Sequence, residues 1–97
     1  MSVLIIGNIA VNDPASLAAY KEAAGASMKE FGIGMVGQVG PTGMLEGEFH
    51  GDITVVLKAE SEEKARAWYT SDAYAKAIAA RSPDAKFTIA LVPRGDD

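Results

Sequence analysis

Four stretches of the chain are rich in Val, Ile and other β-favouring residues, and they predict four strands. The first covers residues 3–11, and the others cover residues 33–39, 53–59 and 87–92. Polar residues, glycines and prolines separate these runs and predict turns or helix ends between them. The chain therefore alternates between strand-like and other segments, with no internal repeat and no linker.

A helix is predicted between the first two strands. Apolar residues recur there at steps of three and four from Leu17 to Phe31, which forms one apolar stripe on a helix. Asp13 can accept hydrogen bonds from the first free backbone N–H groups, and Pro14 fits the first turn at little cost. Gly32 suits a left-handed residue at the other end. We therefore expect this helix to begin after Asp13 and to end at Gly32.

A second helical segment is predicted between the third and fourth strands. Ser61 can cap its start, and Trp68 lies on its apolar stripe. Ser71 can end one helical segment and cap another that carries Ile78, so a bend or break is expected there. The order is βαββαβ in a single domain over residues 1–97. It predicts an α+β, ferredoxin-like fold with a four-stranded antiparallel sheet and both helical segments on one face.

The two faces of the predicted sheet differ in composition. Side chains alternate along a strand, and one set is wholly apolar and should lie under the helices: Val3, Ile5, Gly7, Ile9, Ile33, Met35, Val39, Ile53, Val55, Leu57, Phe87, Ile89 and Leu91. The other set mixes aliphatic and uncharged polar side chains with one Lys: Leu4, Ile6, Asn8, Ala10, Val36, Gln38, Thr54, Val56, Lys58, Thr88, Ala90 and Val92. A solvated sheet face normally carries more charge. The pattern therefore predicts a homodimer, a dimeric α+β barrel in which two such faces pack together.

Four uncharged polar residues of the second set would be buried by this pairing: Asn8, Gln38, Thr54 and Thr88. Burial is tolerable only where they bond to each other, to water or to a ligand. We therefore place them as candidate ligand-binding residues in or beside the barrel. Met44 and Leu45 lie in the long segment before the third strand and would fold over the partner subunit.

Charge and composition exclude several classes of function. The net charge is −4, and no cluster of Lys and Arg is present, which argues against a nucleic-acid partner. The absence of cysteine excludes disulfides, thiolate zinc sites and thiol catalysis. The apolar run at residues 3–11 is far shorter than the roughly 20 residues that span a bilayer. We therefore expect a cytoplasmic protein with no membrane partner, no metal and no cofactor.

Few residues suggest catalysis. His50 is the only histidine and could serve as a general base, although an exposed turn residue is the simpler interpretation. Trp68, Tyr69 and Tyr74 could line a pocket for an aromatic molecule, or they could simply pack a helix against the core. Arg81 could hold a carboxylate, or it could interact with helix carbonyls.

Several short segments together resemble the small bacterial family known as DUF1330, a domain of unknown function within the dimeric α+β barrel superfamily. They are residues 11–14 followed by Tyr20, residues 45–47, and residues 65–69 followed by Ser71, Tyr74 and Arg81. The resemblance implies the ferredoxin-like fold and a face-to-face dimer, and it implies no activity. Such proteins often carry a basic residue and a Gly-Gly pair near the second strand, whereas residues 31–40 here hold no charge. An anion-binding role for that basic residue therefore does not transfer.

Three functions stay open at this point. The favoured one is a homodimer that binds a small, aromatic metabolite with Asn8, Gln38, Thr54, Thr88, Trp68 and Arg81 as binding residues. The second is a cofactor-independent monooxygenase-like or isomerase-like enzyme that uses Asn8 as a hydrogen-bond donor and His50 or Tyr69 for proton transfer. The third is a purely structural interaction module. No nucleophile with its base, carboxylate pair or metal cluster favours the enzyme.

Overall fold

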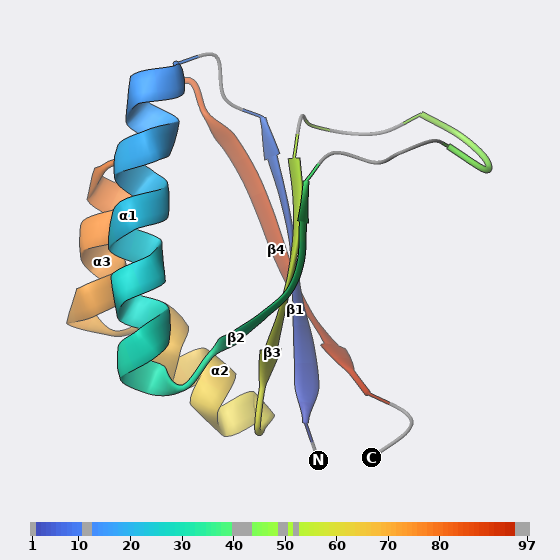
Figure 1. The fold of residues 1–97 in the computed structure, drawn as a ribbon, viewed down its shortest axis with the longest axis vertical. Coiled ribbons are helices and arrows are strands. Elements are labelled where there is room, and N and C mark those ends of the chain that lie inside the picture. Colours follow the sequence, from blue (N-terminus) through green and yellow to red (C-terminus); the bar gives the residue numbers. More distant parts are fainter. Residues whose placement is uncertain (1, 11–12, 40–43, 49–50, 52, 95–97) are drawn as a thin grey trace.

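The chain folds into a four-stranded sheet with helices on one side (Figure 1). The structure, a computed structural model, describes residues 2–10, 13–39, 44–48, 51 and 53–94, with only the backbone at 38–39. The elements in chain order are β1 (Val3–Ala10), α1 (Pro14–Phe31), β2 (Gly34–Val39), β3 (Ile53–Ala59), α2 (Glu62–Tyr69), α3 (Asp72–Ala79) and β4 (Lys86–Pro93). The predicted α+β order is confirmed.

Side-chain caps set the ends of the helices. The Asp13 carboxylate accepts hydrogen bonds from the backbone N–H groups of Ala15 and Ser16 at 3.1 and 3.4 Å. Gly32 ends α1 with a φ of 68°, a left-handed conformation that costs glycine nothing. Ser71 separates α2 from α3 because its hydroxyl accepts from the N–H of Tyr74 at 3.1 Å. The predicted break in the second helical segment is therefore confirmed.

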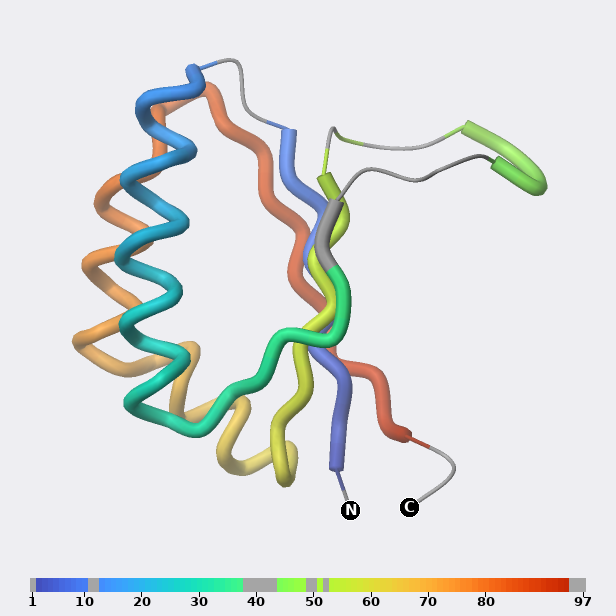
Figure 2. The backbone as a smooth tube through the Cα atoms, in the orientation of Figure 1, coloured from blue at the N-terminus to red at the C-terminus, as the bar shows by residue number. Residues whose placement is uncertain are grey.

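The strands run in the order β2-β3-β1-β4, and every neighbouring pair is antiparallel. All three helices lie on one face of this sheet, as the backbone trace in Figure 2 also shows. None of the described helices covers the other face, and residues 44–48 project away from it on the side opposite the helices (Figure 1). The ferredoxin-like fold with one uncovered face is thus confirmed for the single chain.

The core lies between the helices and the covered face of the sheet. Tyr74 and Ala77 of α3 are fully buried, and Ile5 of β1 is 2% exposed. The other buried apolar residues alternate along the strands or recur on the inner sides of the helices, as the pattern predicted: Val3, Ile9, Tyr20, Ala24, Ile33, Leu57, Ala59, Ala65 and Trp68. Burial of this stripe is the main stabilising contribution to the fold.

A β-bulge changes the register of β2. Met35 pairs with Leu57, and Gly37 then pairs with Val56, so one extra residue lies between the two pairs. Beyond the bulge the backbone of Gln38 lies opposite Val55, and that of Val39 lies opposite Thr54. The sequence pattern grouped Gln38 with Thr54 on one face and Val39 with Val55 on the other, and this pairing reverses both assignments. Strict alternation fails here because a bulge inserts a residue without a partner.

Candidate functional site

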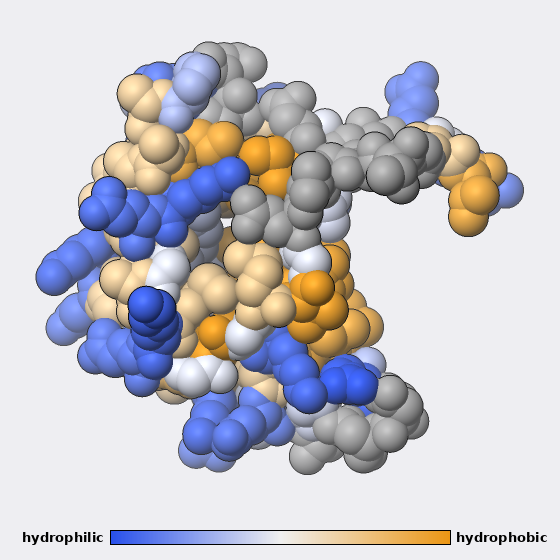
Figure 3. Space-filling model, in the orientation of Figure 1, coloured by the Kyte–Doolittle hydropathy of each residue, from blue (hydrophilic) through white to orange (hydrophobic). Residues whose placement is uncertain are grey.

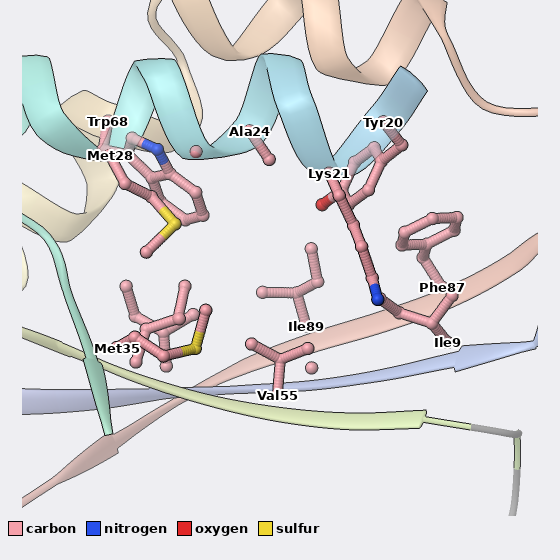
Figure 4. A pocket seen from close by; sticks show the side chains of 14 residues that line it. Ile9, Tyr20, Lys21, Ala24, Met28, Met35, Val55, Trp68, Phe87 and Ile89 are labelled. Atoms are coloured by element: carbon pink, nitrogen blue, oxygen red, sulfur yellow. The ribbon is translucent and has the colours of Figure 1, made fainter. Parts of the chain in front are cut away.

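A cavity of about 130 Å³ lies between α1 and the covered face of the sheet (Figure 4). We call it the α1–sheet cavity. Its lining is almost entirely apolar and comes from all four strands, α1 and α2: Ile5, Gly7, Ile9, Tyr20, Lys21, Ala24, Gly25, Met28, Met35, Val55, Leu57, Trp68, Phe87 and Ile89. Such a lining favours apolar ligands, with the few polar groups fixing their orientation.

Small residues on α1 leave this space open. Ala24 and Gly25 line the cavity where a helix would normally present larger side chains. A Cβ at Gly25 would meet nothing within 4 Å. Glycine in a helix interior lowers helix stability by about 1 kcal/mol relative to alanine, so Gly25 does not stabilise α1. The glycine therefore maintains volume rather than relieving a clash.

The single tryptophan forms one end of the cavity. The indole N–H of Trp68 donates to the hydroxyl of Ser27 at 2.9 Å, and that hydroxyl donates to the carbonyl of Ala24 at 2.7 Å. Trp68 is 3% exposed and Ser27 is 1% exposed. These two bonds fix the ring on α1, so the cavity wall is rigid at this end.

Lys21 and Met35 are the two exposed residues of the described lining. Met35 is 52% exposed. Figure 4 shows Lys21 extending from α1 across the gap toward the strands, near the end formed by Phe87 and Ile9. It is the only charged residue in the described lining.

Four residues, Tyr20, Tyr74, Arg81 and Phe87, form a cluster at the other end, which we call the Tyr–Arg cluster. Tyr20 and Tyr74 are buried, whereas Arg81 and Phe87 are partly exposed. Arg81 Nη2 donates to the Tyr74 hydroxyl at 2.9 Å, and the hydroxyls of Tyr74 and Tyr20 lie 2.6 Å apart. The Arg81 guanidinium stacks 3.8 Å from the centre of the Phe87 ring. Its Nε is buried and has no hydrogen-bond partner in the described structure. Burial, and then the hydrogen bond with Tyr20, raise the pKa of Tyr74 well above its ordinary value.

A second hollow of about 620 Å³ runs beside α2, and it shares Ile5, Trp68 and Ile89 with the lining of the first. Tyr69 lines it together with charged residues of α2, Glu63 and Arg66. Tyr69 is 44% exposed, and its ring lies 5.4 Å from that of Tyr74. The predicted catalytic candidate Tyr69 is therefore outside the α1–sheet cavity.

The uncovered side of the sheet, which we call the open face, carries the other predicted binding residues. Its side chains are Leu4, Ile6, Asn8, Ala10, Thr54, Val56, Lys58, Thr88, Ala90 and Val92. Asn8 pairs with Thr54 on one side and with Thr88 on the other, and the Thr54 hydroxyl donates to Asn8 Oδ1 at 2.9 Å. These three side chains form a row on the open face, across the sheet from the cavity.

The predicted site residues thus divide between places. Trp68 lines the cavity, and Arg81 supports its Tyr20 wall through Tyr74. Asn8, Thr54 and Thr88 lie on the open face, the Gln38 side chain and His50 lie outside the described residues, and Tyr69 lines the α2 hollow.

Sequence reasoning missed most of the cavity lining as site residues, including Tyr20, Lys21 and Gly25. The sequence did contain a signal for this part of the cavity. Gly25 interrupts an otherwise periodic helix, and Lys21 lies one turn before it on the same face.

Among the described residues, no three His, Cys, Asp or Glu side chains converge to hold an ion. None of the described helices combines the length and apolarity that crossing a bilayer requires.

Comparisons with known proteins agree with this fold. A protein of unknown function from Rhodopseudomonas palustris, RPA0582, superposes with a TM-score of 0.69 at 17% identity over 92% of this chain and 80% of its own. A dimeric ferredoxin-like protein of unknown function from Thermobifida fusca gives 0.50 at 16% identity over 95% and 92%. No curated protein matches. The sequence pattern of the DUF1330 domain of unknown function matches residues 2–94, and the chain belongs to that family.

Proposed function

We propose that this protein is a homodimer that binds a small aromatic molecule in the α1–sheet cavity of each subunit. The observation that carries the proposal is the cavity itself, about 130 Å³ with a nearly apolar lining. An engineered apolar cavity of about 150 Å³ in another protein binds benzene. A single aromatic ring is therefore the class of ligand that this space suits.

The shape and chemistry of the walls support an aromatic ligand. Trp68, Tyr20 and Phe87 offer ring faces and edges to a bound ring, which favours offset or edge-to-face contacts. Met28 and Met35 supply flexible thioethers that adapt to ligands of somewhat different shape. Trp68 is held in place by Ser27, so the ligand would find a preformed wall and lose little affinity to ordering it.

The open face supports the dimer. Its centre is aliphatic, and Val92 at one edge is 41% exposed. Hydrophobic surface gathers on that side of the sheet and again on residues 44–48 (Figure 3), where Leu45 is fully exposed and Met44 is 49% exposed. Large exposed apolar patches mark interaction sites. The related Thermobifida fusca protein is described as dimeric, which agrees with this assignment.

In such a dimer the row of Asn8, Thr54 and Thr88 would be buried between the sheets. The bond from Thr54 to Asn8 satisfies one acceptor, and the amide N–H groups of Asn8 have no partner among the described residues. A partner subunit, trapped water or a second ligand would have to accept them.

The cavity favours binding over catalysis. Its described lining has no carboxylate, histidine or hydroxyl nucleophile beside a base. Asn8, the donor that an isomerase-like or monooxygenase-like mechanism would use, lies on the opposite face of the sheet from this cavity.

Light scattering after size exclusion tests the dimer, and a titration with toluene tests the cavity. We expect twice the chain mass at micromolar concentration. We also expect toluene to change the fluorescence of Trp68, the only tryptophan, in a saturable way. A monomer would refute the interface, and unaltered Trp68 emission up to the solubility of toluene would refute the ligand site.

A further inference from the structure

The Tyr–Arg cluster holds more hydrogen-bond donors than acceptors. Arg81 donates to the Tyr74 oxygen, and the two tyrosine hydroxyls are 2.6 Å apart. One of the two hydroxyl hydrogens makes that contact, and the second hydroxyl hydrogen has no acceptor among the described residues. An unsatisfied buried donor is destabilising, so the position of this free hydrogen decides how stable the cluster is.

The direction of the tyrosine pair follows from burial. If Tyr20 donated to Tyr74, the free hydrogen would belong to Tyr74, which is fully buried and lies outside the cavity lining. If Tyr74 donates to Tyr20, the free hydrogen belongs to Tyr20, which lines the cavity. Figure 4 shows the Tyr20 hydroxyl turned inward, toward the other lining side chains. The second arrangement therefore presents one donor to the cavity.

Two cations flank the same end of the cavity. Lys21 extends from α1 toward the strands near Phe87 and Ile9 (Figure 4), and the Arg81 guanidinium lies behind the Phe87 ring at 3.8 Å. No Asp or Glu is in the described lining, and no ion pair of Lys21 or Arg81 is among the salt bridges of the described residues. This end of an otherwise apolar cavity is therefore positive, although the chain as a whole carries a charge of −4.

From this geometry we infer that the preferred ligand is a small aromatic carboxylate, with its ring against Trp68 and its carboxylate at the Tyr20–Lys21 end. The inference rests on the proposed function, because it names the ligand class of the same cavity. The Tyr20 hydroxyl donates to one carboxylate oxygen, and Tyr74 and Arg81 behind it strengthen that donor through the chain of hydrogen bonds. The Lys21 ammonium neutralises the carboxylate at the solvent side.

The test compares two probes that share a ring, benzoate and toluene, by following the indole N–H resonance of Trp68 in NMR titrations. Wild type should bind benzoate more tightly than toluene. Tyr20→Phe should weaken benzoate binding by about tenfold or more, as expected for loss of a charge-assisted hydrogen bond. Lys21→Met should weaken it by about two- to fivefold, as expected for an exposed ion pair. Toluene binding should not change in either variant.

Lys29→Met is the matched control, because Lys29 lies on the same helix and is exposed but does not line the cavity. It should leave benzoate binding unchanged. Circular dichroism will show whether Tyr20→Phe folds, and if it does not, Lys21→Met alone decides the inference. Toluene binding as tight as that of benzoate, or benzoate binding that neither variant alters, would overturn the carboxylate assignment and leave the proposed function intact. Failure of both probes to shift the Trp68 resonance would overturn both.

Discussion

The hydroxyl of Tyr74 lies between Arg81 and Tyr20, and it accepts the only described hydrogen bond of the Arg81 side chain. Removing this hydroxyl should therefore lower the free energy of unfolding. The hydroxyl accepts a hydrogen bond from Arg81 Nη2 at 2.9 Å, and its oxygen lies 2.6 Å from the hydroxyl oxygen of Tyr20. Tyr74→Phe keeps the ring, which is fully buried and packs 4.5 Å from Trp68. The substitution therefore removes two hydrogen bonds while leaving the apolar packing in place.

The cost can be worked from the two bonds. A hydrogen bond to a charged group contributes about 1.5–3 kcal/mol and a neutral one about 0.5–1.5 kcal/mol. Tyr74→Phe loses one of each and leaves the Arg81 guanidinium without its described bond, so the free energy of unfolding should fall by about 2–4 kcal/mol. Tyr20→Phe loses only the neutral bond and should cost about 1 kcal/mol. The stacking of Arg81 on Phe87 persists in both variants.

Urea unfolding followed by Trp68 fluorescence measures both values at one fixed protein concentration. Tyr69→Phe is the matched control, because the Tyr69 ring is 44% exposed and no described hydrogen bond involves its hydroxyl. We expect no measurable change for it. If Tyr74→Phe were no more destabilising than Tyr20→Phe, the Arg81–Tyr74 bond would contribute nothing, and the account of the cluster would be wrong.

The open face, Gly25 and the raised pKa of Tyr74 each lead to an expected result. Ile6→Asp places a charge at the centre of the open face, and light scattering should show that it converts the dimer to a folded monomer. Ala19→Asp, on the exposed side of α1, should leave the dimer intact. If the Ile6→Asp protein is still a dimer, the interface lies elsewhere. Gly25→Ala should raise the free energy of unfolding by up to about 1 kcal/mol, because its Cβ meets nothing within 4 Å, and a lower thermal midpoint would contradict the space seen there. The pKa of Tyr74 is raised in the folded state. Above pH 10.0, the ordinary pKa of tyrosine, the unfolded state therefore loses a proton that the folded state keeps. The free energy of unfolding should fall as pH rises past that value. The free energy of unfolding of Tyr74→Phe should fall less steeply with pH than that of wild type. An equal fall in both proteins would show that Tyr74 is not the cause.

Local signals predicted the elements well, because each is decided within a few residues. The carboxylate of Asp13, the glycine at position 32 and the hydroxyl of Ser71 each end or begin a helix in the structure as their chemistry predicts. The bulge of β2 was not predictable in the same way. It depends on how β2 pairs with β3, and only Gly37 hinted at an irregular strand.

The site was harder to predict because a cavity is a property of several elements together. Alternation correctly assigned Ile5, Val55 and Ile89 to the covered face, but it could not show that α1 fails to fill the space above them. The same alternation drew attention to Asn8 and its neighbours, whose polar groups line the open face instead. Arg81 was identified as a residue that could hold a carboxylate, and the structure shows the hydroxyls of Tyr74 and Tyr20 between it and the cavity.

The most direct test of the central claim is a toluene titration of wild type and Gly25→Leu, observed at the indole N–H resonance of Trp68. Gly25 lines the cavity, and a Cβ there meets open space, so leucine should fill the cavity without disturbing the helix. We expect a saturable shift in wild type and none in a well-folded Gly25→Leu. An equal shift in the two proteins would show that toluene binds elsewhere and would contradict the account.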